Sequence, residues 1–176
     1  MDRCFFIAVV VATVFVYTVA KTSKGDCGKG VSWTLDEDTL VVVFSGKGGM
    51  GECNISYGFQ FAIVSAIVEE GITSLPKFAF GAYGRLESVS LPKTLQSIGL
   101  YSFAGCNSLK QVNISEDNPY FTSIDDVIYD KGATTLYSFP CGKTDNFTTP
   151  DFVQTVGKVA FSSCRNLKTY PLEILS

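Results

Sequence analysis

Apolar and polar residues alternate in short runs that recur along this chain. In residues 88–91, Val89 and Leu91 alternate with two serines, and this alternation predicts a short strand with one buried face. Pro92 ends the strand, because proline has no N–H to donate to a neighbouring strand. The apolar residues that follow are three to five positions apart, so a return path could turn them toward one interior: Leu95, Ile98, Phe103, Cys106 and Leu109.

This pattern belongs to a unit of 23 residues that recurs along the sequence. Residues 88–110 and 146–168 share Pro, Gln, Gly, Phe, Cys, Leu and Lys in register, where average usage would give roughly one or two identities. A more diverged copy occupies residues 65–87. A fixed period of this length indicates a solenoid, because single coils cannot bury their apolar residues and stacked coils can. We therefore expect a β-rich α/β solenoid.

The apolar spacing at the predicted strands is that of the strand half of a leucine-rich repeat. Together with a second half of the form Ile-Gly-x-x-Ser/Ala-Phe-x-x-Cys-x-x-Leu, the unit resembles the BspA-type leucine-rich repeat of microbial surface proteins. The first copy departs from this pattern, since Pro76 replaces the turn glycine and Tyr83 replaces the cysteine. The strand spacing is carried by Leu86, Val89 and Leu91, by Leu109, Val112 and Ile114, and by Leu167, Tyr170 and Leu172.

The resemblance extends beyond the repeats and gives the expected domain organisation. Residues 27–50 are similar to the N-terminal cap of that family, and two alternating runs around Asp36-Glu37-Asp38 predict a β-hairpin there. Residues 115–130 are similar to its hairpin-bearing variant repeat. We expect a β cap at residues 21–60 and a solenoid at 61–176, composed of copies 65–87 and 88–110, the variant 111–145, copy 146–168 and an incomplete strand at 169–176.

The first 20 residues have a different character. Cys4 to Ala20 carries no charge and ends in the small residues Thr18-Val-Ala20, which predicts a secretory signal peptide cut after Ala20. An uncleaved signal anchor is the alternative, because roughly 20 apolar residues span a bilayer. Either case places the protein outside the cell, secreted or at the cell surface, and no later run is long enough to span a membrane.

Removal of residues 1–20 leaves five cysteines, so at least one thiol should be unpaired or bonded to another chain. Cys27 and Cys53 bracket the cap and form a possible disulfide, although connectivity cannot be deduced from sequence. Cys106 and Cys164 share one repeat register and are expected to be small buried apolar residues. Cys141 remains between the copies.

The composition excludes much chemistry. The chain has no histidine, which removes Ser-His-Asp and Cys-His catalysis and histidine-ligated zinc. Asp125, Asp126 and Asp130 do not have the spacing of a calcium-binding EF-hand loop. The net charge of −3 gives no basic field for nucleic acid. We therefore expect no enzymatic activity, no metal and no cofactor. The alternative is a carbohydrate-active enzyme that uses a pair of carboxylates.

A glycine-rich segment, residues 46–51, satisfies G-x-G-x-x-G after a predicted strand. A dinucleotide site needs a helix that begins at the last glycine, and the residues after Gly51 are poor helix formers. We interpret the segment as a turn in the cap.

Three N-glycosylation sequons begin at Asn54, Asn113 and Asn146. If Asn113 lies on the outward face of its strand, a glycan there would block that face. Either the site is unused or the sheet is not the binding face.

The function expected from these observations is non-enzymatic. Stacked strands would form a continuous parallel sheet, and extended solenoid surfaces are the usual binding faces of repeat proteins; solvated polar positions without a partner are the alternative. The resemblance implies an adhesion or recognition module that binds host, matrix or other cell-surface proteins. A second hypothesis is a structural cap or fragment of a larger array that self-associates through its open C-terminal coil. The outward, partner-binding candidates are Ser65, Ile67, Ser88, Ser90, Gln111, Asn113, Thr148 and Thr169.

Overall fold

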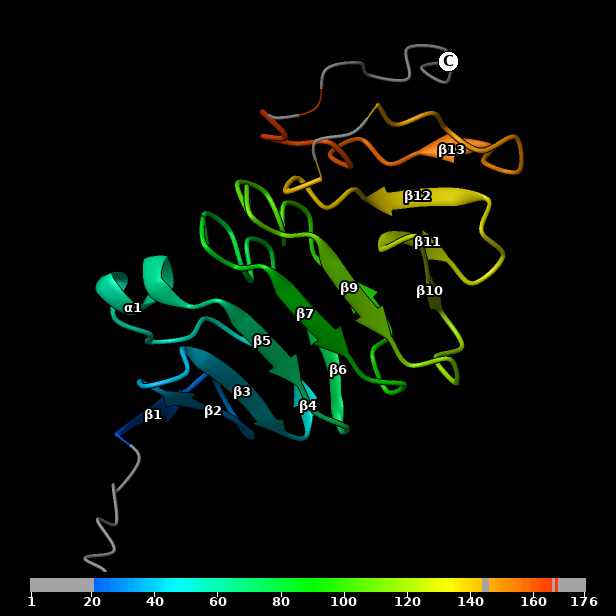
Figure 1. Ribbon diagram of the computed structural model, residues 1–176. Coiled ribbons are helices and arrows are strands. Elements are labelled where there is room, and N and C mark those ends of the chain that lie inside the picture. Colours follow the sequence, from blue (N-terminus) through cyan, green and yellow to red (C-terminus); the bar gives the residue numbers. More distant parts are fainter. Residues whose placement is uncertain (1–20, 144–145, 166, 168–176) are drawn as a thin grey trace, which may run out of the picture.

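The computed structural model describes residues 21–143, 146–165 and 167. They form a β-solenoid of about five turns with repeats of about 23 residues (Figure 1). The one helix of the described chain, α1 (Tyr57–Ala62), has six residues and leads into the first coil. The solenoid is thus confirmed, and its helical share is smaller than "α/β" implies, because the coils return through turns.

A six-stranded sheet begins in the cap and continues into the coils. The cap strands are antiparallel and the coil strands join them in parallel. The predicted cap hairpin is present, with a further strand, β1, on its outer side. The strands are β1 (Thr22–Asp26), β2 (Val31–Asp36), β3 (Val41–Gly46), β5 (Ser65–Val68), β7 (Ser88–Leu91) and β9 (Gln111–Ile114), in this spatial order.

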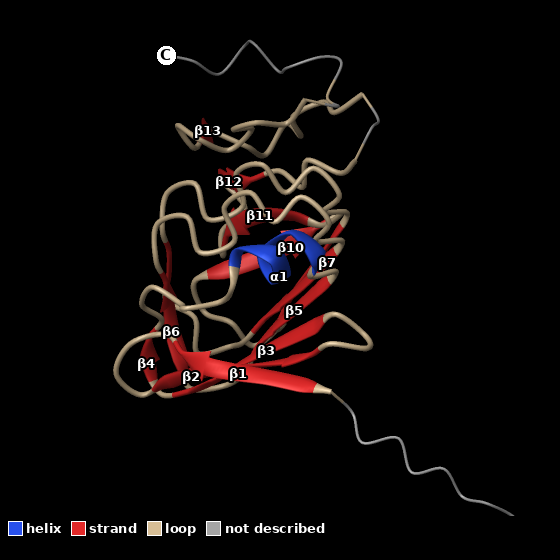
Figure 2. Ribbon diagram, turned by 90° about the vertical axis from the view of Figure 1, so that its left-hand side faces the viewer, coloured by secondary structure: helices blue, strands red, loops and turns tan. Residues whose placement is uncertain are grey.

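A second, shorter sheet lies on the other side of the coils. Its three strands are β4 (Gly48–Gly49), β6 (Ile72–Leu75) and β8 (Ser97–Ile98), all parallel. Figure 2 shows β4 and β6 on one side and β3, β5 and β7 on the other. Gly46 ends β3 and the next glycines form β4, so the glycine-rich segment is a corner of the cap and opens no helix.

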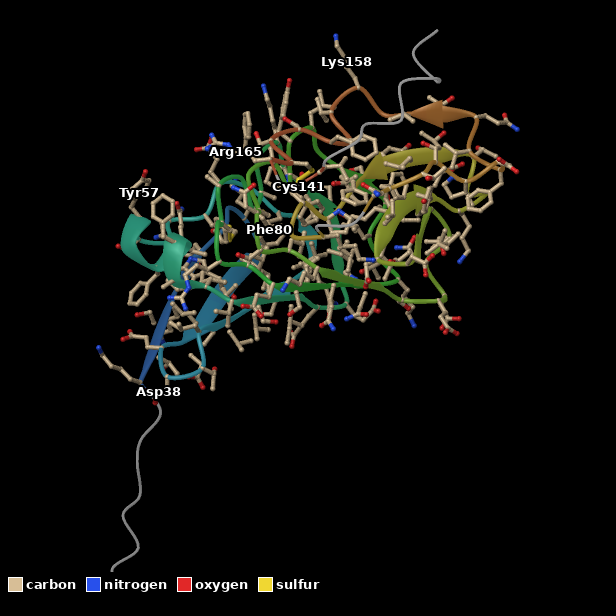
Figure 3. The ribbon with its side chains drawn as sticks, turned by 45° about the horizontal axis from the view of Figure 1, so that its top comes forward. Asp38, Tyr57, Phe80, Cys141, Lys158 and Arg165 are labelled. Carbon is tan, nitrogen blue, oxygen red and sulfur yellow. A yellow bond between two sulfur atoms is a disulfide. The ribbon has the colours of Figure 1, made fainter. Side chains whose placement is uncertain are left out.

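The return paths of successive coils stack on one another through backbone hydrogen bonds. The N–H groups of Phe78, Phe80 and Ala82 donate to carbonyl oxygens of the next coil, at Leu100, Ser102 and Ala104. The rings of Phe80 and Phe103 stack with centroids 5.5 Å apart, and Figure 3 shows Phe80 inside the stack. The 23-residue period therefore aligns both backbone and side chains.

The variant repeat contains the expected hairpin. β10 (Phe121–Ile124) pairs with β11 (Val127–Asp130), which pairs with β12 (Thr135–Ser138) and through it with β13 (Thr155–Val156). These four strands form a separate sheet. The expectation of one continuous parallel sheet is therefore wrong, because the inserted hairpin redirects the chain and the six-stranded sheet ends at β9.

The hairpin also divides the interior into two cores. β11 is buried on both faces: Ile128 packs in the first core, whereas Val127 and Tyr129 pack in the second. The second core also contains Leu136 and Phe139. The solenoid is thus two hydrophobic units that share one strand.

The cysteines form two disulfides, between Cys27 and Cys53 and between Cys141 and Cys164. The first is the cap disulfide anticipated from the sequence. The second corrects the interpretation of Cys164 as a small apolar residue. This disulfide forms because Cys141 and Cys164 are 23 residues apart, and one coil of that length places them side by side. Cys106 is a free, buried thiol, as expected.

Candidate functional site

The candidate site is the outward surface of β5, β7 and β9, called here the open face. Ser65, Ser88 and Gln111 lie in one cross-strand row, and Ile67, Ser90 and Asn113 lie in the next. All six residues are exposed or half-buried, whereas the residues between them are buried. The sheet lies in front of β4 and β6 in Figure 1. Parallel pairing with a 23-residue step therefore brings six of the eight predicted residues together.

Two predicted residues are not part of the open face. Thr148 is exposed, but residues 146–150 form no strand, and Thr148 lines a different hollow beside the hairpin. The prediction that Thr148 lies on the sheet is therefore wrong, because the variant repeat displaces the following coil from the line of β9. Thr169 lies outside the described residues.

The cap extends the same surface, which the sequence reasoning missed. Val41 and Val43 of β3 are half-buried and pair with Ser65 and Ile67, and Thr34 of β2 is exposed opposite Val43. With neighbouring strands about 4.8 Å apart, six strands span about 24 Å. The alternation in β2 and β3 was the signal that could have revealed this extension.

Side-chain hydrogen bonds join adjacent coils on the open face and near the start of β6. The hydroxyl of Ser88 donates to Oγ of Ser65 at 2.8 Å, and the hydroxyl of Thr94 donates to the carbonyl oxygen of Ile72 at 2.9 Å. Thr94 Oγ1 also accepts from the N–H of Gly71 at 2.9 Å. These contacts join adjacent coils; of the three, the Ser65–Ser88 bond lies on the open face and fixes the first row of β5 against β7.

A hollow of about 680 Å³ lies at the carboxyl ends of β5, β7 and β9. Parallel strands place their carboxyl ends at one edge of a sheet, so equivalent positions of three coils meet there. Ser90 and Asn113 belong both to this hollow and to the open face. We call it the acidic trough; its lining residues are Val68, Glu69, Glu70, Ser90, Leu91, Pro92, Asn113, Ile114, Ser115 and Glu116.

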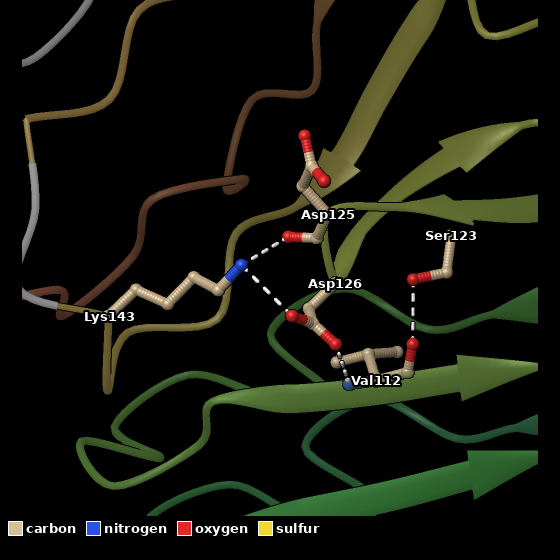
Figure 4. Close-up of polar contacts among 5 residues, drawn as sticks. All are labelled: Val112, Ser123, Asp125, Asp126 and Lys143. Carbon is tan, nitrogen blue, oxygen red and sulfur yellow. Dashed lines mark hydrogen bonds and ion pairs between the residues drawn. The ribbon is translucent and has the colours of Figure 1, made fainter.

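The hairpin next to β9 is fixed by a polar clamp (Figure 4). Nζ of Lys143 lies 3.0 Å from Oδ2 of Asp126 and also donates to the carbonyl oxygen of Asp125. Oδ1 of Asp126 accepts from the N–H of Val112 at 3.3 Å, and the hydroxyl of Ser123 donates to the Val112 carbonyl at 2.6 Å. The clamp joins the hairpin tip to both β9 and the following segment.

The third hairpin acid is also engaged in the fold. Oδ1 of Asp130 accepts from the N–H of Thr135 at 2.6 Å, and Oδ2 accepts from the hydroxyl of Thr134 at 3.0 Å. No cluster of three or more Asp, Glu, Cys or His residues suited to a metal occurs in the part of the chain that is described.

The three sequon asparagines lie in different environments. Asn113 is exposed within β9, on the open face, and Asn146 is exposed outside any strand. Asn54 is exposed, and its Oδ1 accepts from Nε1 of Trp33 at 2.9 Å and from the N–H of Asp26 at 3.2 Å. Asn54 thus has a structural role in the cap, which the sequence motif does not reveal.

Comparison with known families identifies the repeat. The profile of a family described as "BspA type Leucine rich repeat region (6 copies)" matches residues 56–139 and 73–174, which is more than half of the chain. No curated protein matches the sequence.

Several solved structures are similar. A leucine-rich repeat protein from Eubacterium ventriosum is 20% identical, with a TM-score of 0.44, over 86% of this chain and 60% of that one. A leucine-rich cell surface protein from Faecalibacterium prausnitzii is 22% identical, with a TM-score of 0.44, over 64% and 36% respectively. A leucine-rich repeat protein from T. pallidum is 18% identical, with a TM-score of 0.39, over 80% and 56%. This chain spans less than two thirds of each.

Proposed function

Because this chain belongs to the BspA-type leucine-rich repeat family, we propose that it is a non-enzymatic adhesion or recognition module, secreted or held at a cell surface. In this proposal the open face binds a host, matrix or other cell-surface protein. The observation that carries the proposal is the pair of in-register polar rows on β5, β7 and β9.

The chemistry of the open face supports protein binding. Serine, glutamine and asparagine side chains supply both donors and acceptors, and their ordered rows lower the entropy that is lost when a partner binds. Half-exposed Ile67, Val41 and Val43 add apolar contact area among them. Extended repeat surfaces of this kind are the usual binding faces of solenoids.

Two observations support a location outside the cell. The disulfides of the cap and the last coil are typical of oxidising compartments. The uncharged segment at residues 4–20 has the composition of a secretory signal. Within the described ranges, no helix is long and apolar enough to cross a membrane.

The absence of histidine from the whole sequence supports a non-enzymatic role, because no imidazole can act as base or nucleophile. The hairpin acids Asp126 and Asp130 are used in the fold.

The test measures binding of the purified, folded protein to extracellular matrix proteins, to cells and to a glycan panel. Ser90→Arg and Asn113→Arg place bulky charges on the open face. We expect either change to weaken binding about tenfold or more, which corresponds to about 1.4 kcal/mol. Matched controls are Gln96→Arg and Ser97→Arg, which lie at exposed positions on the side of β8.

Two outcomes would overturn the proposal. One is a folded protein, by circular dichroism, that binds none of these surfaces. The other is an equal loss of binding in the open-face variants and in the β8 controls.

A further inference from the structure

The acidic trough combines an apolar floor with carboxylates from two coils that flank a third. Val68 and Leu91 are buried beneath it, and Pro92 of the central coil lines it. Glu69 and Glu70 follow β5 on one side, and Glu116 follows β9 on the other. The three glutamates line a hollow whose flanking strands, β5 and β9, are two strand spacings apart, or about 10 Å.

These carboxylates are not neutralised within the described chain. The ion pairs found there join Lys21 to Glu37 and Lys143 to Asp126, and neither involves the trough. Oε1 of Glu70 accepts from the backbone N–H of Lys93 at 3.1 Å. Lys131 approaches Glu116, but its Nζ donates to the backbone carbonyl oxygen of Glu116, at 2.9 Å, and not to the carboxylate.

The size of the trough suits an extended peptide. A width of about 10 Å accommodates one extended chain, whose own strand spacing is about 4.8 Å. The partly exposed side chain of Ile114 can contact the methylene stem of a lysine or arginine, while the charged end reaches a carboxylate. Ser90 and Asn113 continue from the trough onto the open face, so a bound segment can contact both.

We propose that the acidic trough binds an extended segment of the partner protein that carries lysine or arginine side chains. The inference rests on the proposed function and adds the chemistry of its partner. Charge complementarity selects the occupant: the carboxylates of Glu69, Glu70 and Glu116 attract a cationic side chain, whereas they repel an acidic segment.

The probe is a capped hexapeptide of alternating Gly and Lys, compared with the same peptide carrying Gln or Glu. Titration of the folded protein is followed by amide chemical shifts in NMR at low ionic strength. We expect the Lys peptide alone to shift the amides of Ser90, Asn113 and Ser115. Because the Debye length falls to about 3 Å at 1 M salt, binding should be lost at that ionic strength.

Two triple variants test the assignment. Glu69→Gln/Glu70→Gln/Glu116→Gln should weaken Lys-peptide binding about tenfold or more. The matched control, Asp38→Asn/Glu52→Gln/Asp151→Asn, removes the same number of carboxylates at exposed positions elsewhere and should bind within about twofold of the wild type.

The outcomes separate this inference from the proposed function. Equal weakening in both triple variants, or spermine binding as tightly as the peptide, would show general attraction of cations and overturn the inference. If the Ser90 and Asn113 arginine variants lose matrix or cell binding while the trough variant keeps it, the inference fails and the proposed function stands. If neither the wild type nor any variant binds matrix proteins, cells or glycans, the proposed function fails, and the inference that rests on it fails with it.

Discussion

At the scale of single residues, the free thiol of Cys106 is held in the first core. Its Sγ donates to the carbonyl oxygen of Phe80 at 3.0 Å. Tyr83, which occupies the same register one coil earlier, is also buried. Burial raises the pKa of Cys106 from 9.0 to about 12 and the pKa of Tyr83 from 10.0 to about 12. Both groups are therefore neutral in the folded protein at physiological pH.

The raised pKa values predict a loss of stability in alkali. Above pH 9, the unfolded chain releases the Cys106 proton while the folded chain keeps it, so the free energy of unfolding decreases as pH rises from 9 toward 12. In the Cys106→Ala variant the free energy of unfolding should decrease less over this pH range. The part of the decrease that comes from ionisation of Tyr83 in the unfolded chain should remain. Urea unfolding of both proteins at pH 7.5, 9 and 10.5 measures it. Parallel pH dependence in the two proteins would contradict the assignment.

The side-chain amide of Asn54 gives a second prediction at this scale. Asn54→Ala removes the acceptor for Trp33 Nε1 and for the Asp26 N–H, so we expect a loss of about 1–3 kcal/mol in the free energy of unfolding. The matched change Asn113→Ala, at an exposed position on β9, should cost less than about 1 kcal/mol. Urea unfolding measures both. A larger loss at Asn113 would be inconsistent with this account.

At the scale of elements, the hairpin β10–β11 is attached through its tip. Asp125 and Asp126 are both in the left-handed region, with φ of 49° and 65°, which fits a tight turn that favours Asn, Asp and Gly. Asp126 then faces Val112 and Lys143. The turn therefore provides both the reversal of the chain and the clamp.

Removal of the clamp should loosen the hairpin in two steps. Asp126→Asn keeps an oxygen for the Val112 N–H and loses the ion pair, which should cost about 0.5–1 kcal/mol, because the pair is partly exposed. Asp126→Ala loses both contacts and should cost about 1–3 kcal/mol. Chemical denaturation measures the series, and hydrogen exchange at Val112 should be faster only in the alanine variant. Equal costs would argue against the hydrogen bond.

At the scale of the whole molecule, the second core depends on its own disulfide. Cys141 and Cys164 join consecutive coils around Phe139 and Leu136. The first core has its own disulfide in the cap and extends from Cys27 to Ile128. The two cores are in contact through the shared strand β11. Apart from this strand, each core is formed by its own set of buried residues.

This division predicts local unfolding when the second disulfide is removed. Cys141→Ala/Cys164→Ala should lose about 2–4 kcal/mol in the stability of the last coil, with faster amide exchange in β12 and β13. Protection in β5, β7 and β9 should be retained, because their core is separate. Cys106→Ala serves as a control for loss of a buried cysteine. Uniform acceleration across all strands would show a single cooperative unit instead.

The sequence by itself determined the repeating features of this protein. Alternation in residues 31–44 and 88–91 predicts strands β2, β3 and β7, and the 23-residue period predicts that Ser65, Ser88 and Gln111 meet. Both patterns are local and repeat with the backbone geometry, so they can be recognised without knowledge of distant contacts. The cap at residues 27–50 and the hairpin at residues 115–130 are expected from the resemblance of these segments to the BspA-type family.

Only the tertiary structure decided where the repetition is interrupted. The direction in which the β10–β11 hairpin turns the chain depends on packing of Ile128 against one core and Tyr129 against the other, which no periodicity encodes. That packing ends the open face at β9 and places Thr148 beside the hairpin instead of on the sheet. The acidic trough is likewise a tertiary feature, because Glu70 and Glu116 line one hollow only when the coils stack and their strand ends share one edge.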